Sequence, residues 1–279
     1  MIIKKNKILT SENKKPILYD VYYSETTKPQ AVVIFCHGYK GFKDWGAWHL
    51  VAEAFAKKGF CFVKFNFSHN GGTLEQPIDF PDLEAFAENN FSLELDDLDR
   101  VLNEIENGNE NLPKIISTIS LIGHSRGGGI VLIKAEEEKR IEKVVTWASV
   151  SDFKARFQED TDEFKEWQQT GITHVENSRT KQMLPHNFQF YKDFKENEER
   201  LNIRRAVKNL KIPQLIVHGS EDPTVSEKEA MAIHSWNPQS ELAVINGGDH
   251  VFGAKHPWIE SSLPEELKNM VEKTIDFLK

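Results

Sequence analysis

Buried β-strands and amphipathic helices alternate along most of this 279-residue chain, and that alternation restricts the folds open to it. Continuous β-rich apolar runs at 31–36 and 60–67 are typical of strands covered on both faces of a parallel sheet. Between them, apolar residues recur at helical spacing from Trp48 to Ala56, and Gly59 is a typical helix stop. The sequence therefore predicts a strand–helix–strand unit.

The same alternation continues to the C-terminus, and a hairpin precedes it. Two short alternating runs, 5–10 and 17–24, predict that hairpin. The later elements that we expect are helices at 93–105, 128–138 and 264–278, and strands at 115–122, 143–149, 214–218 and 242–245. Together these elements predict a single α/β domain over residues 1–279, built on a doubly wound, mostly parallel sheet.

The strand pattern stops between about residues 151 and 210. Aromatic residues in this segment pair at helical spacing, as Phe153 does with Phe157 and Phe164 with Trp167. We therefore predict a helical insertion placed over the sheet, which would form a cap on a site at the sheet edge. A solvated helical excursion is the alternative.

A Gly-x-Ser-x-Gly pentapeptide, Gly123 to Gly127, lies between a predicted strand and a predicted helix. A tight turn at this place leaves no room for side chains at the two glycines and presents the serine hydroxyl at the carboxyl edge of the sheet. Open α/β sheets bind their ligands at that edge. Ser125 is therefore the candidate nucleophile, and an idle serine in a glycine-rich turn is the alternative.

A serine hydroxyl is a weak nucleophile that needs a base, and the base needs an orienting acid. His250 is the candidate base because it lies in a glycine-containing loop after the last predicted strand. We expect His124 to point away from Ser125 along the turn, and His37 only ends a strand.

The candidate acid is Asp222, which follows the strand at 214–218. Glu221 and Asp249 are neighbouring carboxylates that compete with it, and Asp152 would supply the acid from a different strand. The order of nucleophile, acid and base along the chain is the order that α/β-hydrolases use.

These motifs resemble those of the α/β-hydrolase superfamily, and within it the cinnamoyl-esterase, dienelactone-hydrolase-like and serine-aminopeptidase-like group. The resemblance covers the chain from about residue 31 onward. The blocks that carry it are His37–Phe42, Gly123–Gly127, His218–Val225 and Gly248–His250. It implies the α/β-hydrolase fold, with a catalytic triad of Ser125, Asp222 and His250.

The resemblance also implies an oxyanion hole made by the backbone N–H groups of Tyr39 and Arg126. One block departs from the family pattern. Residues 65–73 have Asn66 where many relatives carry aspartate, and they lack the usual Gly-x-Gly-x-Ser arrangement. For this reason the substrate of a particular relative does not transfer to this chain.

The residues and the resemblance together predict a serine hydrolase that cleaves an ester-like acyl bond of a small molecule through an acyl-enzyme. No metal or organic cofactor is expected. An aminopeptidase, an acyl-peptide hydrolase or an acyltransferase would use the same triad, and a non-catalytic binding protein on a hydrolase scaffold is the remaining alternative. The phenylalanines from Phe153 to Phe194, with Trp167 and Tyr191, are interpreted as the insertion's own packing, and an aromatic acyl pocket is the alternative.

Composition argues against other classes of protein. The net charge is −8 and the basic residues are dispersed, which disfavours a nucleic-acid partner. No apolar stretch approaches the roughly 18 residues of a membrane span or follows the N-terminal lysines as a signal peptide would, so we expect a cytoplasmic, non-membrane protein. Cys36 and Cys61 lie in predicted buried strands, where we expect reduced thiols.

Overall fold

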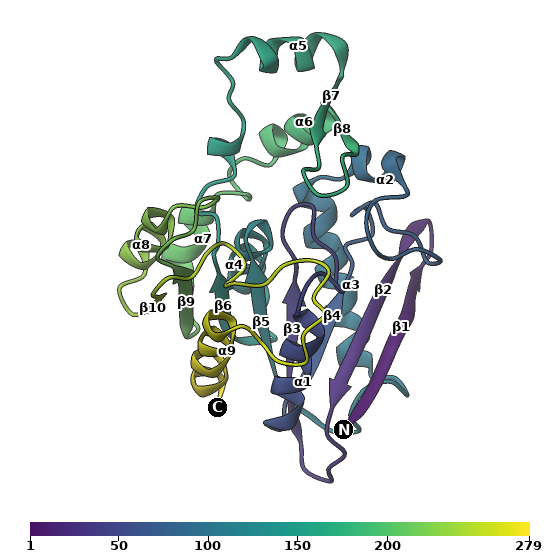
Figure 1. Cartoon of the computed structure of the whole chain (residues 1–279), viewed down its shortest axis with the longest axis vertical. Coiled ribbons are helices and arrows are strands. Elements are labelled where there is room, and N and C mark those ends of the chain that lie inside the picture. The colour runs from purple at the N-terminus through teal and green to yellow at the C-terminus, as the bar shows by residue number, and fades with distance from the viewer.

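Eight strands form one sheet in the computed structural model, which describes residues 1–279 (Figure 1). The strands, in their order across the sheet, are β1 (Ile2–Ser11), β2 (Lys14–Tyr23), β4 (Cys61–Phe65), β3 (Gln30–Cys36), β5 (Ile116–His124), β6 (Ile141–Trp147), β9 (Gln214–Gly219) and β10 (Glu241–Ile245). The β1–β2 and β2–β4 pairs are antiparallel and the other pairs are parallel. The predicted hairpin and the predicted mostly parallel sheet are both confirmed.

Helices cover both faces of the sheet. One face packs against α1 (Trp48–Lys57) and α9 (Glu265–Leu278). The other face packs against α3 (Phe91–Asn107), α4 (Arg126–Glu137), α7 (Ile203–Asn209) and α8 (Glu227–Trp236). A short helix, α2 (Leu83–Glu88), follows β4. Burial of the sheet between two helical layers explains why β3 and β4 are apolar on both faces rather than alternating, with Lys64 of β4 as the exception.

Most of the segment from 151 to 210 extends beyond the sheet at the top of Figure 1, whereas its last helix, α7, packs on the sheet. The prediction that the whole segment is helical is wrong. The segment contains a short 3-10 turn (Lys154–Arg156), α5 (Asp162–Thr170), β7 (Ile172–Glu176), β8 (Met183–Asn187) and α6 (Gln189–Glu196), before α7. Strands β7 and β8 form an antiparallel hairpin. Gly171 ends α5 in a left-handed conformation, and the β-branched residues after it favour the extended chain.

Two further features bear on the expectations from sequence. None of the helices combines the length and the apolar character needed to cross a membrane. Cys36 and Cys61 are buried on adjacent strands and form no disulfide, as expected.

Four charged side chains meet inside the fold and tie the loop after β3 to the sheet. Lys64 of β4 and Asp20 of β2 lie opposite each other and pair at 2.7 Å, and neither side chain is exposed. Lys43 reaches the other oxygen of Asp20 at 2.9 Å, and Asp44 accepts from both lysines at 2.5 Å. Burial would raise the pKa of Asp44, but the two ammonium groups hold it well below its usual value. The loop is therefore held by a compensated buried charge cluster.

Replacing Lys64 with methionine should strongly destabilise the protein, because it leaves the buried Asp20 carboxylate short of one partner. Breaking a buried pair from one side costs about 3–5 kcal/mol. Lys57→Met is the matched control, since Lys57 and its partner Glu53 lie at the surface and such a pair contributes about 0–1 kcal/mol. Urea unfolding followed by circular dichroism measures both changes, and equal losses in the two variants would contradict the account.

Candidate active site

Ser125 occupies a backbone conformation that few residues other than glycine adopt. It stands between β5 and α4 with φ 55° and ψ −121°. A Cβ at Gly123 would lie 2.2 Å from the carbonyl oxygen of Gly127, and a Cβ at Gly127 would lie 2.5 Å from the carbonyl oxygen of Cys36. Both positions thus require glycine, and the tight turn projects the Ser125 side chain from the carboxyl end of the sheet.

His250 and Asp222 converge on Ser125 from the loops after the last two strands. His250 follows β10, and its Nε2 lies 3.1 Å from Ser125 Oγ. Its Nδ1 lies 2.8 Å from Oδ2 of Asp222, which follows β9. Parallel strands end at one edge of the sheet, which brings together residues that are 125 and 28 positions apart in the chain. The structure thus forms a continuous chain of hydrogen bonds from hydroxyl to imidazole to carboxylate.

The Asp222 carboxylate is fully buried and oriented by its neighbours. Its Oδ1 accepts hydrogen bonds from the backbone N–H groups of Thr224 at 2.8 Å and Val225 at 2.9 Å. Oδ2 faces His250 and also lies 3.3 Å from Nε2 of His218. Burial would raise the pKa of Asp222, but the hydrogen bonds from His218, His250 and the backbone hold it well below its usual value. The carboxylate therefore stays ionised at neutral pH, as an acid that orients a histidine must.

The competing carboxylates make other contacts. Asp249 Oδ1 accepts from the N–H groups of Val251 at 3.0 Å and Gly253 at 2.9 Å, which caps the loop that carries His250. Asp152 accepts from the N–H of Lys154 at 2.7 Å. Glu221 is exposed. Asp222 is the one of these carboxylates that bonds to His250.

The two other candidate histidines hold loops of the site in place. His124 Nε2 lies 2.8 Å from the carbonyl oxygen of His250, to which it donates, so it holds the backbone that carries the base. His37 Nε2 accepts from the N–H of Phe67 at 3.3 Å and joins the loops after β3 and β4. Burial lowers the pKa of His124 to about 3 and that of His37 to about 4, so both rings are neutral. The backbone contact of His124 was not predicted from sequence.

The loop after β3 places a free backbone N–H beside Ser125. A Cβ at Gly38 would lie 2.8 Å from the Cβ of Ser125, so the loop approaches the serine closely. The backbone N–H of Tyr39, the next residue, makes no hydrogen bond. Arg126 is the first residue of α4, and its N–H has no acceptor within the helix. Both predicted oxyanion donors are thus available to a ligand.

Asn66, the residue at which the chain departs from the family pattern, anchors this loop. Its Oδ1 accepts from the N–H of Lys43 at 2.6 Å, and its Nδ2 donates to the carbonyl oxygen of Pro77 at 3.1 Å. Asn66 and the buried ion pairs of Lys43 therefore fix the same loop.

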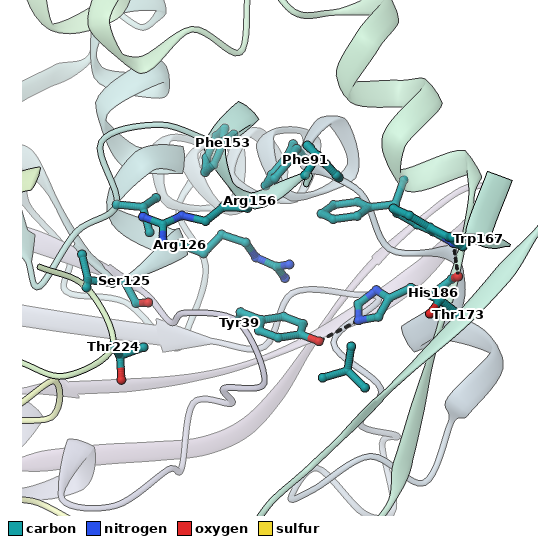
Figure 2. Close-up of a pocket in the computed structure, with 15 residues that line it drawn as sticks. Tyr39, Phe91, Ser125, Arg126, Phe153, Arg156, Trp167, Thr173, His186 and Thr224 are labelled. Atoms are coloured by element: carbon teal, nitrogen blue, oxygen red, sulfur yellow. Dashed lines mark hydrogen bonds between the residues drawn. The ribbon is translucent and has the colours of Figure 1, made fainter. Parts of the chain in front are cut away.

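An aromatic cavity of about 420 Å³ opens beside Ser125 (Figure 2). Its lining residues come from the core and from the insertion, and they are Tyr39, Phe91, Ser125, Arg126, Val150, Phe153, Arg156, Phe157, Trp167, Thr173, Val175, His186, Phe190, Thr224 and Val225. The expectation that the insertion's aromatic residues serve only its own packing is wrong in part. Phe153, Phe157, Trp167 and Phe190 face the cavity, although they also belong to the core cluster or pack against it.

The positive charges in the cavity wall are compensated. The guanidinium of Arg126 extends into the cavity (Figure 2), 5.0 Å from the centre of the Tyr39 ring. It pairs with the buried carboxylate of Glu94. Arg156 pairs with Glu229 in the same way. The pairing of Glu94 with Arg126 was not predicted from sequence, because the two residues lie on different helices and are 32 positions apart. The cavity therefore presents aromatic surface rather than net charge.

A second cavity, of about 430 Å³, also borders Ser125. The two cavities share Tyr39, Ser125 and Thr224, whereas His250 lines only the second. The serine thus stands at the junction of two spaces, and the imidazole faces one of them.

Comparisons with known proteins identify the family of this fold. The family model described as "alpha/beta hydrolase fold" matches residues 31–182. The chain belongs to the α/β-hydrolase family. No curated protein matches it in sequence.

Solved structures similar to this hydrolase extend over nearly its whole length. Est1E from Butyrivibrio proteoclasticus has a TM-score of 0.73 at 14% identity, with 99% of this chain and 98% of that chain covered. Est1E with ferulic acid bound has a TM-score of 0.71 at 15% identity, with 98% and 97% covered. The esterase domain of a Rhodothermus marinus protein has a TM-score of 0.61 at 21% identity, with 91% of each chain covered. At these identities the likeness shows the fold alone.

The strained backbone of the hydrolase at Ser125 predicts an unusual order of stability. A non-glycine residue in such a conformation costs about 1–3 kcal/mol. Ser125→Gly should therefore be more stable than Ser125→Ala by on the order of 1 kcal/mol, after the larger unfolded-chain entropy of glycine is subtracted. Both variants lack the hydroxyl, so thermal and urea unfolding compare the backbone alone, and a more stable alanine variant would contradict the strain.

Proposed function

We propose that this α/β hydrolase is a serine carboxylic ester hydrolase. The observation that carries the proposal is the chain of hydrogen bonds from Ser125 Oγ to His250 Nε2 and from His250 Nδ1 to Asp222. That arrangement is what activates a serine hydroxyl, and a protein that only bound a ligand would have no need of it.

The mechanism follows from the positions of these groups. His250 takes the proton as Ser125 Oγ attacks the acyl carbonyl, and Asp222 stabilises the imidazolium. The N–H groups of Tyr39 and Arg126 stabilise the oxyanion. His250 then gives its proton to the leaving oxygen, which departs as the alcohol and leaves the acyl group on Ser125. Water deprotonated by His250 attacks this ester, and collapse of the second intermediate returns the proton to Ser125 and releases the acid.

We further propose that the insertion acts as a cap and that the cavity beneath it takes an aromatic acyl group. Phe153, Phe157, Trp167 and Phe190 of the insertion supply apolar surface around the space next to Ser125. The binding of ferulic acid, an aromatic acid, by the similarly folded Est1E agrees with this interpretation. Because the arginines of the wall are already paired, the fit is to a neutral aryl group rather than to an anionic one.

Ser125→Ala should lower kcat on a 4-nitrophenyl ester by a factor on the order of 10⁴ or more, because both nucleophile and acyl-enzyme are lost. Asp222→Asn should keep the hydrogen-bonded geometry and still lower kcat by about 10⁴, because the amide N–H donates to His250 Nδ1 and so holds the imidazole in the wrong tautomer. Stopped-flow or steady-state absorbance of 4-nitrophenolate measures both. Wild-type turnover in Ser125→Ala would exclude the mechanism, and faster turnover of a peptide than of an ester would favour a peptidase.

The acyl preference is tested with two esters of one alcohol. The 3-phenylpropenoate ester should have a higher kcat/KM than the acetate, because the aryl group buries apolar surface in the cavity. Phe190→Ala should reduce that ratio by roughly tenfold, since it removes part of the wall. Met231→Ala, at an exposed position on α8 that does not line the cavity, is the control. An unchanged ratio in Phe190→Ala would remove the aromatic cavity as the acyl pocket.

A further inference from the structure

The second cavity beside Ser125 differs in chemistry from the first. Its lining includes the indole rings of Trp45 and Trp48 and two cationic side chains, Lys40 and Arg179. No aspartate or glutamate lines it, although the chain as a whole carries a net charge of −8. An excess of positive charge inside an acidic protein requires an explanation.

Lys40 is the group in this cavity whose charge is not compensated. Arg179 is paired with Asp79, whereas Lys40 takes part in no ion pair or hydrogen bond. The Lys40 ammonium lies 5.2 Å from the centre of the Tyr39 ring and is partly buried. Burial lowers the pKa of Lys40, and no neighbouring carboxylate opposes that effect. Elsewhere in the fold the buried lysines at 43, 64 and 134 all have acidic partners.

The backbone around this lysine is held in a specific conformation. Lys40 has a φ of 55°, the left-handed region that side chains other than glycine and asparagine rarely occupy. The loop that contains it is held by Asn66 and by the buried charge cluster. The loop therefore holds the backbone of Lys40 next to Tyr39, and the ammonium lies over the Tyr39 ring in the wall of the cavity.

The position of His250 assigns a role to this cavity. In ester hydrolysis the imidazole that received the serine proton must deliver it to the leaving oxygen, so the leaving group lies beside the imidazole. His250 lines the second cavity and not the aromatic one. The alcohol part of the ester would accordingly occupy the space that contains Lys40.

We infer that the preferred substrates are esters whose leaving alcohol carries an anionic group, a carboxylate or a phosphate, which pairs with Lys40. The two tryptophans would contact the carbon frame of that alcohol. This inference rests on the proposed ester hydrolysis at Ser125 and adds the leaving-group class to it.

The test uses three esters of 3-phenylpropanoic acid that differ at one point of the leaving group. The leaving groups are three para-substituted phenols. They are 4-hydroxyphenylacetate, the neutral 4-hydroxyphenylacetamide, and 4-hydroxybenzylphosphonate. The methylene group insulates the phenol from the charge, so the three leaving groups have similar intrinsic reactivity. Release of the phenol, followed by liquid chromatography, gives kcat/KM for each ester in the wild-type enzyme and its variants.

In the wild-type enzyme, kcat/KM should be roughly fivefold higher for at least one anionic ester than for the ester with the neutral amide. The anionic ester with the larger ratio identifies which anion, carboxylate or phosphonate, the site prefers. Lys40→Met should abolish the preference, Lys40→Arg should retain most of it, and added salt should reduce it. The ratio of two esters cancels any general effect of a variant on Ser125. Lys58→Met, at an exposed position at the end of α1, should leave the ratio unchanged.

The outcomes separate this inference from the proposed function. If none of the esters is hydrolysed, the ester hydrolase itself is contradicted. The role of Lys40 is overturned if the esters are hydrolysed but the ester with the neutral leaving group has a kcat/KM equal to or higher than those of the anionic esters. It is also overturned if Lys40→Met keeps the preference for the anionic leaving group. In both cases the proposed hydrolase stands.

Discussion

The backbone of Ser125 is the constraint on which the rest of the site depends. A residue with φ 55° and ψ −121° is held there because β5 must pass directly into α4, with glycines at 123 and 127 where the strands and helix come too close for a side chain. The turn costs about 1–3 kcal/mol in local strain, which the packing of β5 in the middle of the sheet offsets. In return the hydroxyl lies beyond the sheet edge, where the loops after β9 and β10 bring an acid and an imidazole to it.

The loops around this turn are fixed by polar contacts that are themselves buried. Asn66 and the cluster of Lys43, Lys64, Asp20 and Asp44 hold the loop after β3, and so hold the Tyr39 N–H beside the serine. The His124 ring holds the loop that carries the base, because its Nε2 donates a hydrogen bond to the carbonyl oxygen of His250. These contacts keep the oxyanion donors and the base in place before a substrate arrives. Such preorganisation is the main source of electrostatic stabilisation of a transition state. Tyr39 of the loop after β3 lines both cavities, of which one is aromatic and the other contains the unpaired Lys40.

The sequence predicted the parts of this arrangement that local patterns encode. The strands, most helices and the positions of Ser125, Asp222 and His250 follow from apolar periodicity and from short motifs at strand ends. Helix α8 was not predicted because only Ala230 and Ile233 of its residues are buried, too few for a clear period. The β7–β8 hairpin was not predicted because aromatic spacing in the insertion suggested helices throughout. The pairs Lys64–Asp20 and Arg126–Glu94 join residues 44 and 32 positions apart, and only the folded chain shows that they meet.

The central claim, that the hydrogen-bonded imidazole activates this strained serine, is tested most directly by covalent labelling. A fluorophosphonate probe reacts with activated serines, and mass spectrometry of the digested protein locates the adduct. We predict one adduct, on Ser125, that forms quickly in the wild-type protein and is almost absent from folded His250→Ala. Labelling of a different serine, no labelling at all, or equal labelling of Ser125 in the two proteins would contradict the account.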